Sequence, residues 1–423
     1  STSNHLAAGS YKQTNTSTLV GTDAGNYNLV GGYTTSGHTY TVSPMTISVT
    51  GQVASNKVYD AAFGAVINSS GASLVGVLAG DEVTLHTGNA IGTFASPDAA
   101  NGIALTVTGK VLSGAASANY DESQTTGLSA NITPAPLTVT ANSDAKFVTE
   151  NDVVGFNGVI YSGIVAGQYP TGTLAITRTN SSQNNAGTYS QVLEPSGLTS
   201  PNYAITYVKG DYTIVPAETL LIKTTNASAS YGSSFGFAPS TVQYLNNQQV
   251  LKTLIQTAVN GNTYTFSDGV GGSATFTLAV TGATSTSGNL VVGSYNITGQ
   301  NFSKVGSNFS GTPIYTGVLS VNKQHLSEST GNVFKVYDGT TAMNGLSIAL
   351  TPVVPGDLIS VMGVGAFSQA GVGSNLQYSV ASLTLSGADS ANYYLSGGST
   401  FSGSNGAITP ATLTVTADNQ SRV

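Results

Sequence analysis

Apolar and polar residues alternate one by one in several short stretches of this chain. In three of them an apolar residue stands at every second position, with Thr or Ser between. The apolar positions are Met45, Ile47 and Val49, then Leu137, Val139 and Ala141, then Leu413, Val415 and Ala417. A period of two with β-branched residues indicates half-buried strands, and the Gly, Asn and Ser clusters between these stretches indicate turns. The pattern predicts a mostly β protein.

One segment departs from this alternation. Residues 243–258 are rich in Gln and Leu, and their apolar positions recur at intervals close to the helical period. These positions are Leu245, Val250, Leu251, Leu254, Ile255 and Ala258. The spacing predicts one short helix here, in an otherwise β chain.

Two parts of the chain repeat each other in the same order. Lys57-Val58-Tyr59-Asp60 recurs as Lys335-Val336-Tyr337-Asp338, the Leu-Ser-Gly-Ala at Leu112 recurs at Leu385, and the Ile-Thr-Pro-Ala at Ile132 recurs at Ile408. The first and last blocks are 75 residues apart in one copy (132 − 57) and 73 in the other (408 − 335). Three matched blocks in register indicate homologous repeats.

Weaker repeats fill the rest of the chain. An Asn-aromatic pair recurs at Asn26-Tyr27, Asn119-Tyr120, Asn202-Tyr203, Asn301-Phe302 and Asn392-Tyr393. A strand-like stretch follows each pair and closes at Pro44, Pro134, Pro216, Asn322 and Pro410. These closings predict a partial repeat over 1–44, complete units over 45–134, 135–216, 217–322 and 323–410 (the first to fourth units), and the start of another repeat over 411–423. Because the chain begins and stops within this pattern, we expect it to belong to a longer protein.

The recurring side chains have a structural and a functional interpretation. Tyr59 and Tyr337 would pack at a sheet edge while Asp60 and Asp338 start a turn, or the four would form a binding epitope. The Asn-aromatic pairs recur once in each unit, which favours a buried ring whose hydroxyl bonds to the backbone, as in a tyrosine corner. The residues concerned are Asn119, Tyr120, Asn202, Tyr203, Asn392 and Tyr393. We expect Tyr120, Tyr203, Phe302 and Tyr393 to be buried at equivalent places.

The junctions between units are short. Pro134 and Pro136 flank a single residue, and their fixed φ angles restrict the residues before them. We therefore expect a tandem array of small β domains, each a sandwich or a β-grasp-like sheet, at least one with a short helix. The domains would have separate cores and stack end to end into an elongated rod.

Composition limits the possible functions. Charged residues make up 7% of the chain, against roughly 25% in ordinary soluble domains. Twelve scattered Lys and Arg residues are too few to neutralise a phosphate backbone, which argues against nucleic acid as a partner. The chain has no cysteine, hence no disulfide and no thiolate metal site. No apolar run is long enough for a membrane-spanning helix.

No arrangement of residues suggests an enzyme. The four histidines, His5, His38, His86 and His325, are spread over the partial repeat, the first unit and the fourth unit without metal-ligand spacing, and no nucleophile or phosphate-binding motif is present. We expect no catalytic, cofactor-binding or metal-binding residue and no cofactor. The alternative is a Ca²⁺ site built from Asp81-Glu82, Asp121-Glu122 or Asp357, although aspartate after glycine more often forms a turn.

The repeated blocks resemble a known family. Lys-Val-Tyr-Asp with Gly339-Thr340-Thr341, the Gly-Asp pairs at Gly80 and Gly356, Leu-Ser-Gly-Ala, Asn-Tyr and Ile-Thr-Pro-Ala-x-Leu-Thr-Val-Thr-Ala resemble the YDG-type repeat of filamentous-haemagglutinin-like adhesins. Residues 187–205 resemble the related MBG-type repeat. The first copy has Ala61-Ala62 where the second has Gly339-Thr340, so its turn could differ.

The resemblance implies an extracellular protein at the surface of a Gram-negative bacterium. Such proteins are often exported by two-partner secretion through an outer-membrane transporter, and they act in adhesion, aggregation and biofilm formation. The chain would then be a structural stalk that projects an adhesive region toward a host surface, a bacterial surface or a biofilm polysaccharide. Alternatively, the repeats themselves bind a carbohydrate or matrix polymer, with the divergent third unit as the first place to look. An enzyme such as a glycosidase ranks last.

Overall fold

The computed structural model describes residues 1–12, 19–27, 39–88, 90–123, 127–165, 167–343, 345–395 and 400–416. The structure is mostly β, as the alternation predicts. The helical segments of the described residues are 3-10 turns of three residues each, η1 (Ala24–Asn26), η2 (Ser117–Asn119) and η3 (Ser390–Asn392). Each turn ends on the asparagine of an Asn-Tyr pair. In the N-terminal segment, β1 (Gly9–Lys12) and β2 (Thr39–Val42) pair antiparallel.

The first unit contains several short strands in four small sheets, ordered β5-β14-β11-β10-β6, β13-β3-β8, β12-β9 and β4-β7. The strands are β3 (Met45–Thr50), β4 (Val53–Ala54), β5 (Lys57–Val58), β6 (Gly64–Ala65), β7 (Ile67–Asn68), β8 (Ser73–Val75), β9 (Thr84–His86), β10 (Ile91–Phe94), β11 (Ala100–Thr108), β12 (Val111–Ser113), β13 (Tyr120–Glu122) and β14 (Ser129–Thr133).

The second unit consists of two sheets, ordered β17-β15-β20 and β16-β21-β19-β18. Its strands are β15 (Ala135–Ala141), β16 (Asp144–Phe147), β17 (Val159–Ser162), β18 (Thr171–Arg178), β19 (Gly187–Thr199), β20 (Tyr203–Val208) and β21 (Gly210–Val215).

The third unit is entirely β and shows that the helix predicted over 243–258 is wrong. Its sheets are ordered β25-β24-β22-β31, β23-β32-β29 and β26-β27-β28-β30. The strands are β22 (Thr219–Thr224), β23 (Ala227–Ser230), β24 (Pro239–Leu245), β25 (Leu251–Thr253), β26 (Ile255–Asn260), β27 (Thr263–Ser267), β28 (Ser273–Ala279), β29 (Gly293–Asn296), β30 (Thr298–Val305), β31 (Ser310–Thr316) and β32 (Val318–Asn322). β24 and β25 form a hairpin because Asn246 closes a turn, accepting from the Val250 N–H at 2.9 Å, and Gln249 takes a left-handed φ of 62°.

The fourth unit repeats the plan of the first. Its sheets are ordered β36-β33-β39 and β34-β40-β38-β37-β35. The strands are β33 (Gln324–Thr330), β34 (Val333–Val336), β35 (Ala342–Met343), β36 (Ile348–Thr351), β37 (Ser360–Phe367), β38 (Gly373–Ser386), β39 (Tyr393–Leu395) and β40 (Phe401–Thr409).

The Leu-Ser-Gly-Ala repeat requires its glycine. Gly114 has φ +104°, and a Cβ there would lie 2.4 Å from the carbonyl oxygen of Glu82. Gly387 has φ +105°, and a Cβ there would lie 2.3 Å from the carbonyl oxygen of Leu358. Both backbones are therefore closed to any L side chain.

Parallel pairing sets the common plan of three units. The first strand of the unit pairs with the strand that begins at the recurring tyrosine, in the registers Met45↔Tyr120, Ala135↔Tyr203 and Gln324↔Tyr393. Each Asn-Tyr pair comes late in the sequence of its unit, but this pairing places it beside the first residues of that unit. The preceding unit ends at the same place. This placement makes the pair available for contacts between units.

The third unit uses a different Asn-aromatic pair from the one the sequence suggests. Its first strand pairs with β31 in the register Thr219↔Ser310, so the equivalent pair is Asn308-Phe309. Phe309 is buried, whereas Phe302 is only partly buried. The burial expected of Phe302 is therefore wrong, and burial holds for Tyr120, Tyr203 and Tyr393.

Strand pairing separates the units from one another, whereas the hydrophobic clusters connect them. The strand pairings of the described residues stay within single units, but the hydrophobic clusters do not. One cluster joins Phe94 and Ile132 of the first unit to Leu137 and Tyr203 of the second. Another joins Phe147 and Val215 to Leu221 and Leu245 across Pro216. The expected separation of cores at Pro134 and Pro216 is not observed, and the unit boundaries stay a prediction.

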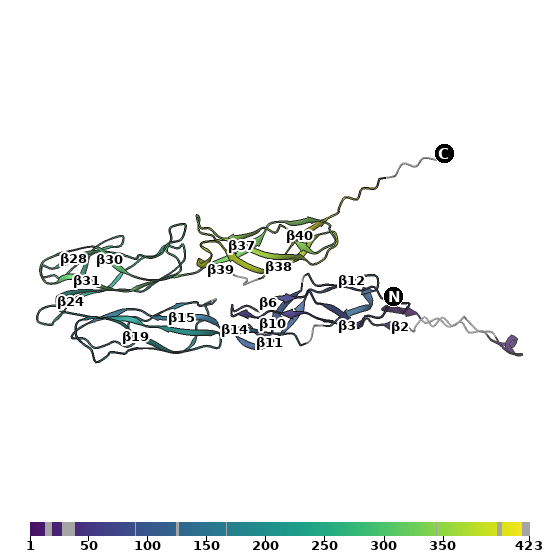
Figure 1. Cartoon of the computed structure of the whole chain (residues 1–423), viewed down its shortest axis with the longest axis horizontal. Coiled ribbons are helices and arrows are strands. Elements are labelled where there is room, and N and C mark those ends of the chain that lie inside the picture. Colours follow the sequence, from purple (N-terminus) through teal and green to yellow (C-terminus); the bar gives the residue numbers. More distant parts are fainter. Residues whose placement is uncertain are drawn as a thin grey trace.

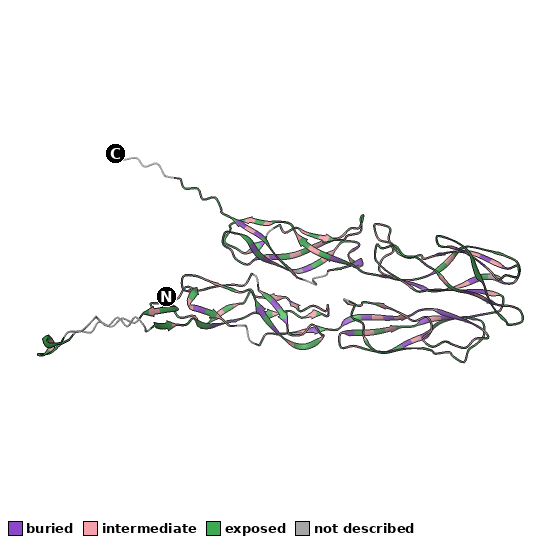
Figure 2. Cartoon of the chain, turned by 180° about the vertical axis from the view of Figure 1, so that it is seen from behind, coloured by how far each residue is buried: buried purple, intermediate pink, exposed green. Residues whose placement is uncertain are grey.

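The units form two rows rather than one rod. The first and second units lie end to end, and so do the third and fourth, but the second pair runs back alongside the first (Figure 1). Side-by-side contact is also evident where a Cβ on Gly88 of the first unit would meet the Thr341 side chain of the fourth. Buried and exposed residues alternate along the strands in both rows (Figure 2). The single extended rod expected from the short junctions is thus replaced by a folded-back arrangement.

Candidate inter-unit interfaces

The N-terminal segment docks on the first unit through Asn119. The Asn119 side-chain oxygen accepts a hydrogen bond from the Ala8 N–H at 2.7 Å, across 111 residues of sequence. Thr2 Oγ1 donates to the Gly80 carbonyl at 3.0 Å, and the Ser3 N–H donates to Asp81 Oδ1 at 2.9 Å. The Gly-Asp pair and the Asn-Tyr pair together form one docking surface.

The interface between the third and fourth units repeats this arrangement. The Asn392 side-chain oxygen accepts from the Val292 N–H at 2.9 Å, across 100 residues. Thr286 Oγ1 donates to the Gly356 carbonyl at 2.9 Å. At both sites the residue after the threonine, Ser3 or Ser287, lies with its Cβ 3.4 Å from where a Cβ on the glycine would be. The two interfaces therefore share the asparagine contact, the threonine contact and the close approach of the serine to the glycine.

A further sequence repeat, which the Asn-aromatic pairs do not reveal, accounts for this match. Residues 1–11 and 285–295 share the pattern Ser-Thr-Ser-x-x-Leu-x-x-Gly-Ser-Tyr. Its final tyrosine bonds back to the carbonyl four residues earlier, Tyr11 to Ala7 and Tyr295 to Val291, each at 2.6 Å. That bond fixes the turn whose next N–H meets the asparagine. The signal for this repeat is the similarity in sequence between the N-terminal segment and the third unit.

The first and second units meet through Asn202 and Tyr203. The Asn202 side-chain oxygen accepts from the Ala99 N–H at 2.8 Å, across 103 residues, and its amide donates to Asp98 Oδ1 at 2.9 Å. The Tyr203 ring packs edge-to-face on Tyr59, with centroids 5.6 Å apart. Edge-to-face aromatic pairs add about 0.5–1.5 kcal/mol beyond area burial.

Tyr120, Tyr203 and Tyr393 each make two hydrogen bonds inside their own unit. The hydroxyl accepts from a backbone N–H upstream: Leu78 to Tyr120 at 3.1 Å, Val165 to Tyr203 at 2.9 Å and Val354 to Tyr393 at 3.0 Å. It also donates, to Asp81 Oδ2 at 2.6 Å, to the Gln168 carbonyl at 2.7 Å and to Asp357 Oδ2 at 2.6 Å, respectively. Each buried hydroxyl therefore has a partner both as donor and as acceptor. These two bonds fix the tyrosine, and with it the asparagine that precedes it in the chain.

Hydrogen bonds perturb the two aspartates of this surface. Bonds from Ser3 and then Tyr120 lower the pKa of Asp81. Burial alone would raise the pKa of Asp357, but bonds from Ser287, Tyr231 and Tyr393 outweigh it and lower that pKa. Burial raises the pKa of both Tyr120 and Tyr393. The carboxylates are thus ionised and act as acceptors.

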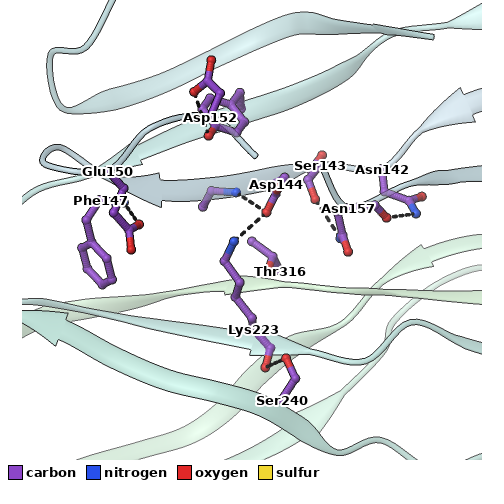
Figure 3. A network of polar contacts seen from close by, with 12 residues as sticks. Asn142, Ser143, Asp144, Phe147, Glu150, Asp152, Asn157, Lys223, Ser240 and Thr316 are labelled. Atoms are coloured by element: carbon purple, nitrogen blue, oxygen red, sulfur yellow. Dashed lines mark hydrogen bonds and ion pairs between the residues drawn. The ribbon is translucent and has the colours of Figure 1, made fainter. Parts of the chain in front are cut away.

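The second and third units meet side by side through different contacts. Lys223 of β22 reaches across to Asp144 of β16 (Figure 3), with Nζ 3.0 Å from Oδ1. Asp144 is buried and also accepts from the Ala145 N–H at 2.7 Å. The Asn226 amide donates to the Asn157 carbonyl at 3.0 Å.

The third unit's own Asn308 does not repeat the docking contact. Its amide donates to Asp268 Oδ2 within the same unit, at 2.7 Å. Beside Pro216, Glu218 takes a left-handed φ of 64° and its N–H donates to the Leu245 carbonyl at 2.7 Å. The chain reverses here, and the third unit packs against the flank of the second.

The Lys-x-Tyr-Asp repeats close identical turns. Lys57 Nζ lies 2.7 Å from Asp60 Oδ1, which accepts from the Ala62 N–H at 2.9 Å. Lys335 Nζ lies 2.6 Å from Asp338 Oδ1, which accepts from the Thr340 N–H at 2.9 Å. The substitution of Ala61 for glycine leaves the turn unchanged, because Ala61 adopts a φ of 60° where Gly339 has 77°. Lys335 is the main cause that lowers the pKa of Asp338 to about 2.

The acidic and histidine residues considered for metal binding stay apart. Across the residues that the structure describes, no group of three or more His, Asp or Glu side chains is placed to hold a metal ion. His38 lies outside these residues. Asp81 and Asp357 instead accept bonds from tyrosines. Nor does this part of the chain contain a helix with the length and apolarity needed to span a membrane.

Comparison with known proteins identifies the repeats. A family model for the YDG domain matches residues 43–127 and 322–401. A model for the MBG domain (YGX type) matches residues 137–213. No curated protein matches the chain significantly. The two YDG matches fall on the units that present Gly-Asp and Asn-Tyr to the preceding segment.

Proposed function

Since this chain belongs to the proteins built from YDG and MBG repeats, we propose that it is the structural stalk region of a large secreted bacterial adhesin. In this proposal it stands at the surface of a Gram-negative cell, after export through an outer-membrane transporter. It carries an adhesive region that serves attachment, aggregation or biofilm formation.

The recurring asparagine contact is the observation that supports this role most. Asn119, Asn202 and Asn392 each bind a backbone N–H of the preceding segment at 2.7–2.9 Å. Hydrophobic clusters continue across the interfaces at Asn202 and Asn392. Consecutive units that share a core and a fixed hydrogen bond cannot swivel freely, and stiffness is what a projecting stalk requires.

The folded-back arrangement changes how such a stalk is built. Two stiff end-to-end pairs lie side by side, so the stem is doubled in width over this region and shorter than a single row of four units. A doubled stem resists bending better than a single row, at the expense of reach.

A second candidate function is a binding module, and the third unit supplies the observation in its favour. All six residues of β26 are exposed, including Ile255 and Val259, and β26 is one of the two edge strands of its sheet. An exposed apolar edge strand is a place where another chain or polymer can bind.

Deleting residues 45–410 in the producing cell, and replacing them with an unrelated repeat array, distinguishes a stalk from a binding module. Antibodies against the chain should label intact cells, and deletion of residues 45–410 should reduce adhesion. A stalk predicts that an unrelated stiff repeat array of similar length restores adhesion. A binding module predicts no restoration, together with saturable binding of the purified chain to surface polysaccharide. Labelling only after lysis would refute both.

A further inference from the structure

The exposed end of the fourth unit has the same framework as the covered end of the first. The Tyr59 N–H donates to the Thr133 carbonyl at 2.8 Å, and the Tyr337 N–H donates to the Thr409 carbonyl at 2.8 Å. Thr133 Oγ1 and Thr409 Oγ1 donate to the carbonyls of Lys57 and Lys335, both at 3.3 Å. The first-unit end binds the second unit, an MBG domain.

The corresponding residues of the fourth unit are uncovered. Tyr337 is 46% exposed where Tyr59 is 5% exposed. Leu413 and Val415 are 87% and 86% exposed, whereas their counterparts Leu137 and Val139 are 1% and 0% exposed. Val372, at the place of Ala99, is 50% exposed. We call Tyr337, Val372, Leu413 and Val415 the open face.

The first-unit end shows what covers such a face. There, β15 pairs in parallel with β20, which begins at Tyr203. That pairing sets the Tyr203 ring on Tyr59 and the Asn202 oxygen on the Ala99 N–H. Residues 411–416 repeat the sequence of β15 at five of six positions, Ala-Thr-Leu-Thr-Val-Thr against Ala-Pro-Leu-Thr-Val-Thr.

We infer that the open face is the docking surface for an MBG-type unit whose first strand is residues 411–416. Its Asn-Tyr pair would set the tyrosine ring on Tyr337 and the asparagine oxygen on the Val372 N–H. One difference from the corresponding end of the first unit would weaken the contact made by the asparagine. Gly371 stands where Asp98 accepts the Asn202 amide, so the new interface lacks that bond. The inference rests on the proposed stalk role, because it describes how the row of units continues.

A grafted chain tests the inference. Residues 141–216 are joined after Thr416, so that the second unit is rebuilt on the fourth. Hydroxyl-radical footprinting then compares Tyr337 in the chain with and without the graft, with Tyr59 as the internal standard. The exposed fractions of 46% and 5% differ about ninefold, so the oxidation rate of Tyr337 should fall several-fold, toward that of Tyr59.

Two variants of the grafted chain sharpen the result. Changing the graft's copy of Asn202 to Ala should return part of the reactivity to Tyr337, and Gly371→Asp should protect Tyr337 further. An unchanged Tyr337 rate with a folded graft would overturn the inference, and so would a graft that stays unfolded, because this end would then fail to support an MBG unit. Neither outcome bears on cell-surface labelling, so the stalk proposal is tested separately.

Discussion

Removing the asparagine at one interface should loosen that interface locally. In Asn392→Ala, the Val292 N–H loses its acceptor at 2.9 Å while the neighbouring Tyr393 remains buried. Leaving a buried donor without a partner costs about 1–3 kcal/mol. Because Asn392 is itself buried, solvent replaces the lost oxygen poorly, and the third–fourth interface bears this cost.

Hydrogen exchange measures the effect where it arises. A loss of about 1–3 kcal/mol corresponds to roughly 5- to 150-fold faster exchange if the amide opens locally. Mass spectrometry of a peptide spanning residues 289–296 should show this acceleration at pH 7, and peptides from the first unit should not change. Asn119→Ala and Asn202→Ala should accelerate exchange at Ala8 and Ala99 in the same way.

The matched control is Asn322→Ala in the third unit. The Asn322 amide donates to Ser228 Oγ at 2.8 Å, in an exposed contact within the unit. This variant should leave exchange at Val292 unchanged. Equal exchange at Val292 in the wild type and in Asn392→Ala would show that the asparagine is not what holds the units together.

Three further predictions concern other parts of the chain. Lys223→Glu places a like charge against buried Asp144, which costs several kcal/mol, so small-angle scattering should show a longer maximum dimension. The control Lys209→Glu breaks an exposed ion pair, in which Lys209 Nζ lies 3.2 Å from Glu194 Oε2, and should leave that dimension unchanged. Ala61→Gly should stabilise the first unit by about 1 kcal/mol, because it removes a left-handed alanine; an unchanged melting temperature would count against this. Acidification should open the third–fourth interface, because the pKa of Asp357 lies below its unfolded value of about 3.9. Ionised Asp357 stabilises the interface fully above the unfolded-state pKa. This stabilisation is lost as the pH falls through the lower folded-state pKa. Exchange at Val292 that does not accelerate between pH 5 and pH 2, after correction for intrinsic rates, would contradict this.

The sequence determines the local structure and the repeats of this chain. Alternation at Leu137, Val139 and Ala141 correctly predicts a strand with one buried face, because side chains of a strand point to opposite faces in turn. The matched blocks identify the two YDG repeats, whereas only the structure shows that the turn at Ala61 matches the one at Gly339. The strand and the repeats depend on neighbouring residues, so they can be read without knowing the fold.

Local spacing misleads where a turn interrupts it. The apolar residues over 243–258 fit a helical period, but Asn246 accepts two backbone N–H groups and Gln249 turns left-handed. The run therefore breaks into separate strands. A competing turn of this kind is decided by side-chain bonds and sheet pairing, which hydrophobic spacing does not encode.

The tertiary structure alone decides how the units meet. Asn392 and Val292 are 100 residues apart, and they come together because parallel pairing returns Tyr393 to the start of its unit. The same rule selects Asn308-Phe309 over Asn301-Phe302 in the third unit, through the register of β31. The reversal after Pro216 depends on Lys223 meeting Asp144 and on Phe147 packing with Leu221. Such contacts join residues from different strands and different units, so the physical cause of the folded-back arrangement lies in packing that no local pattern contains.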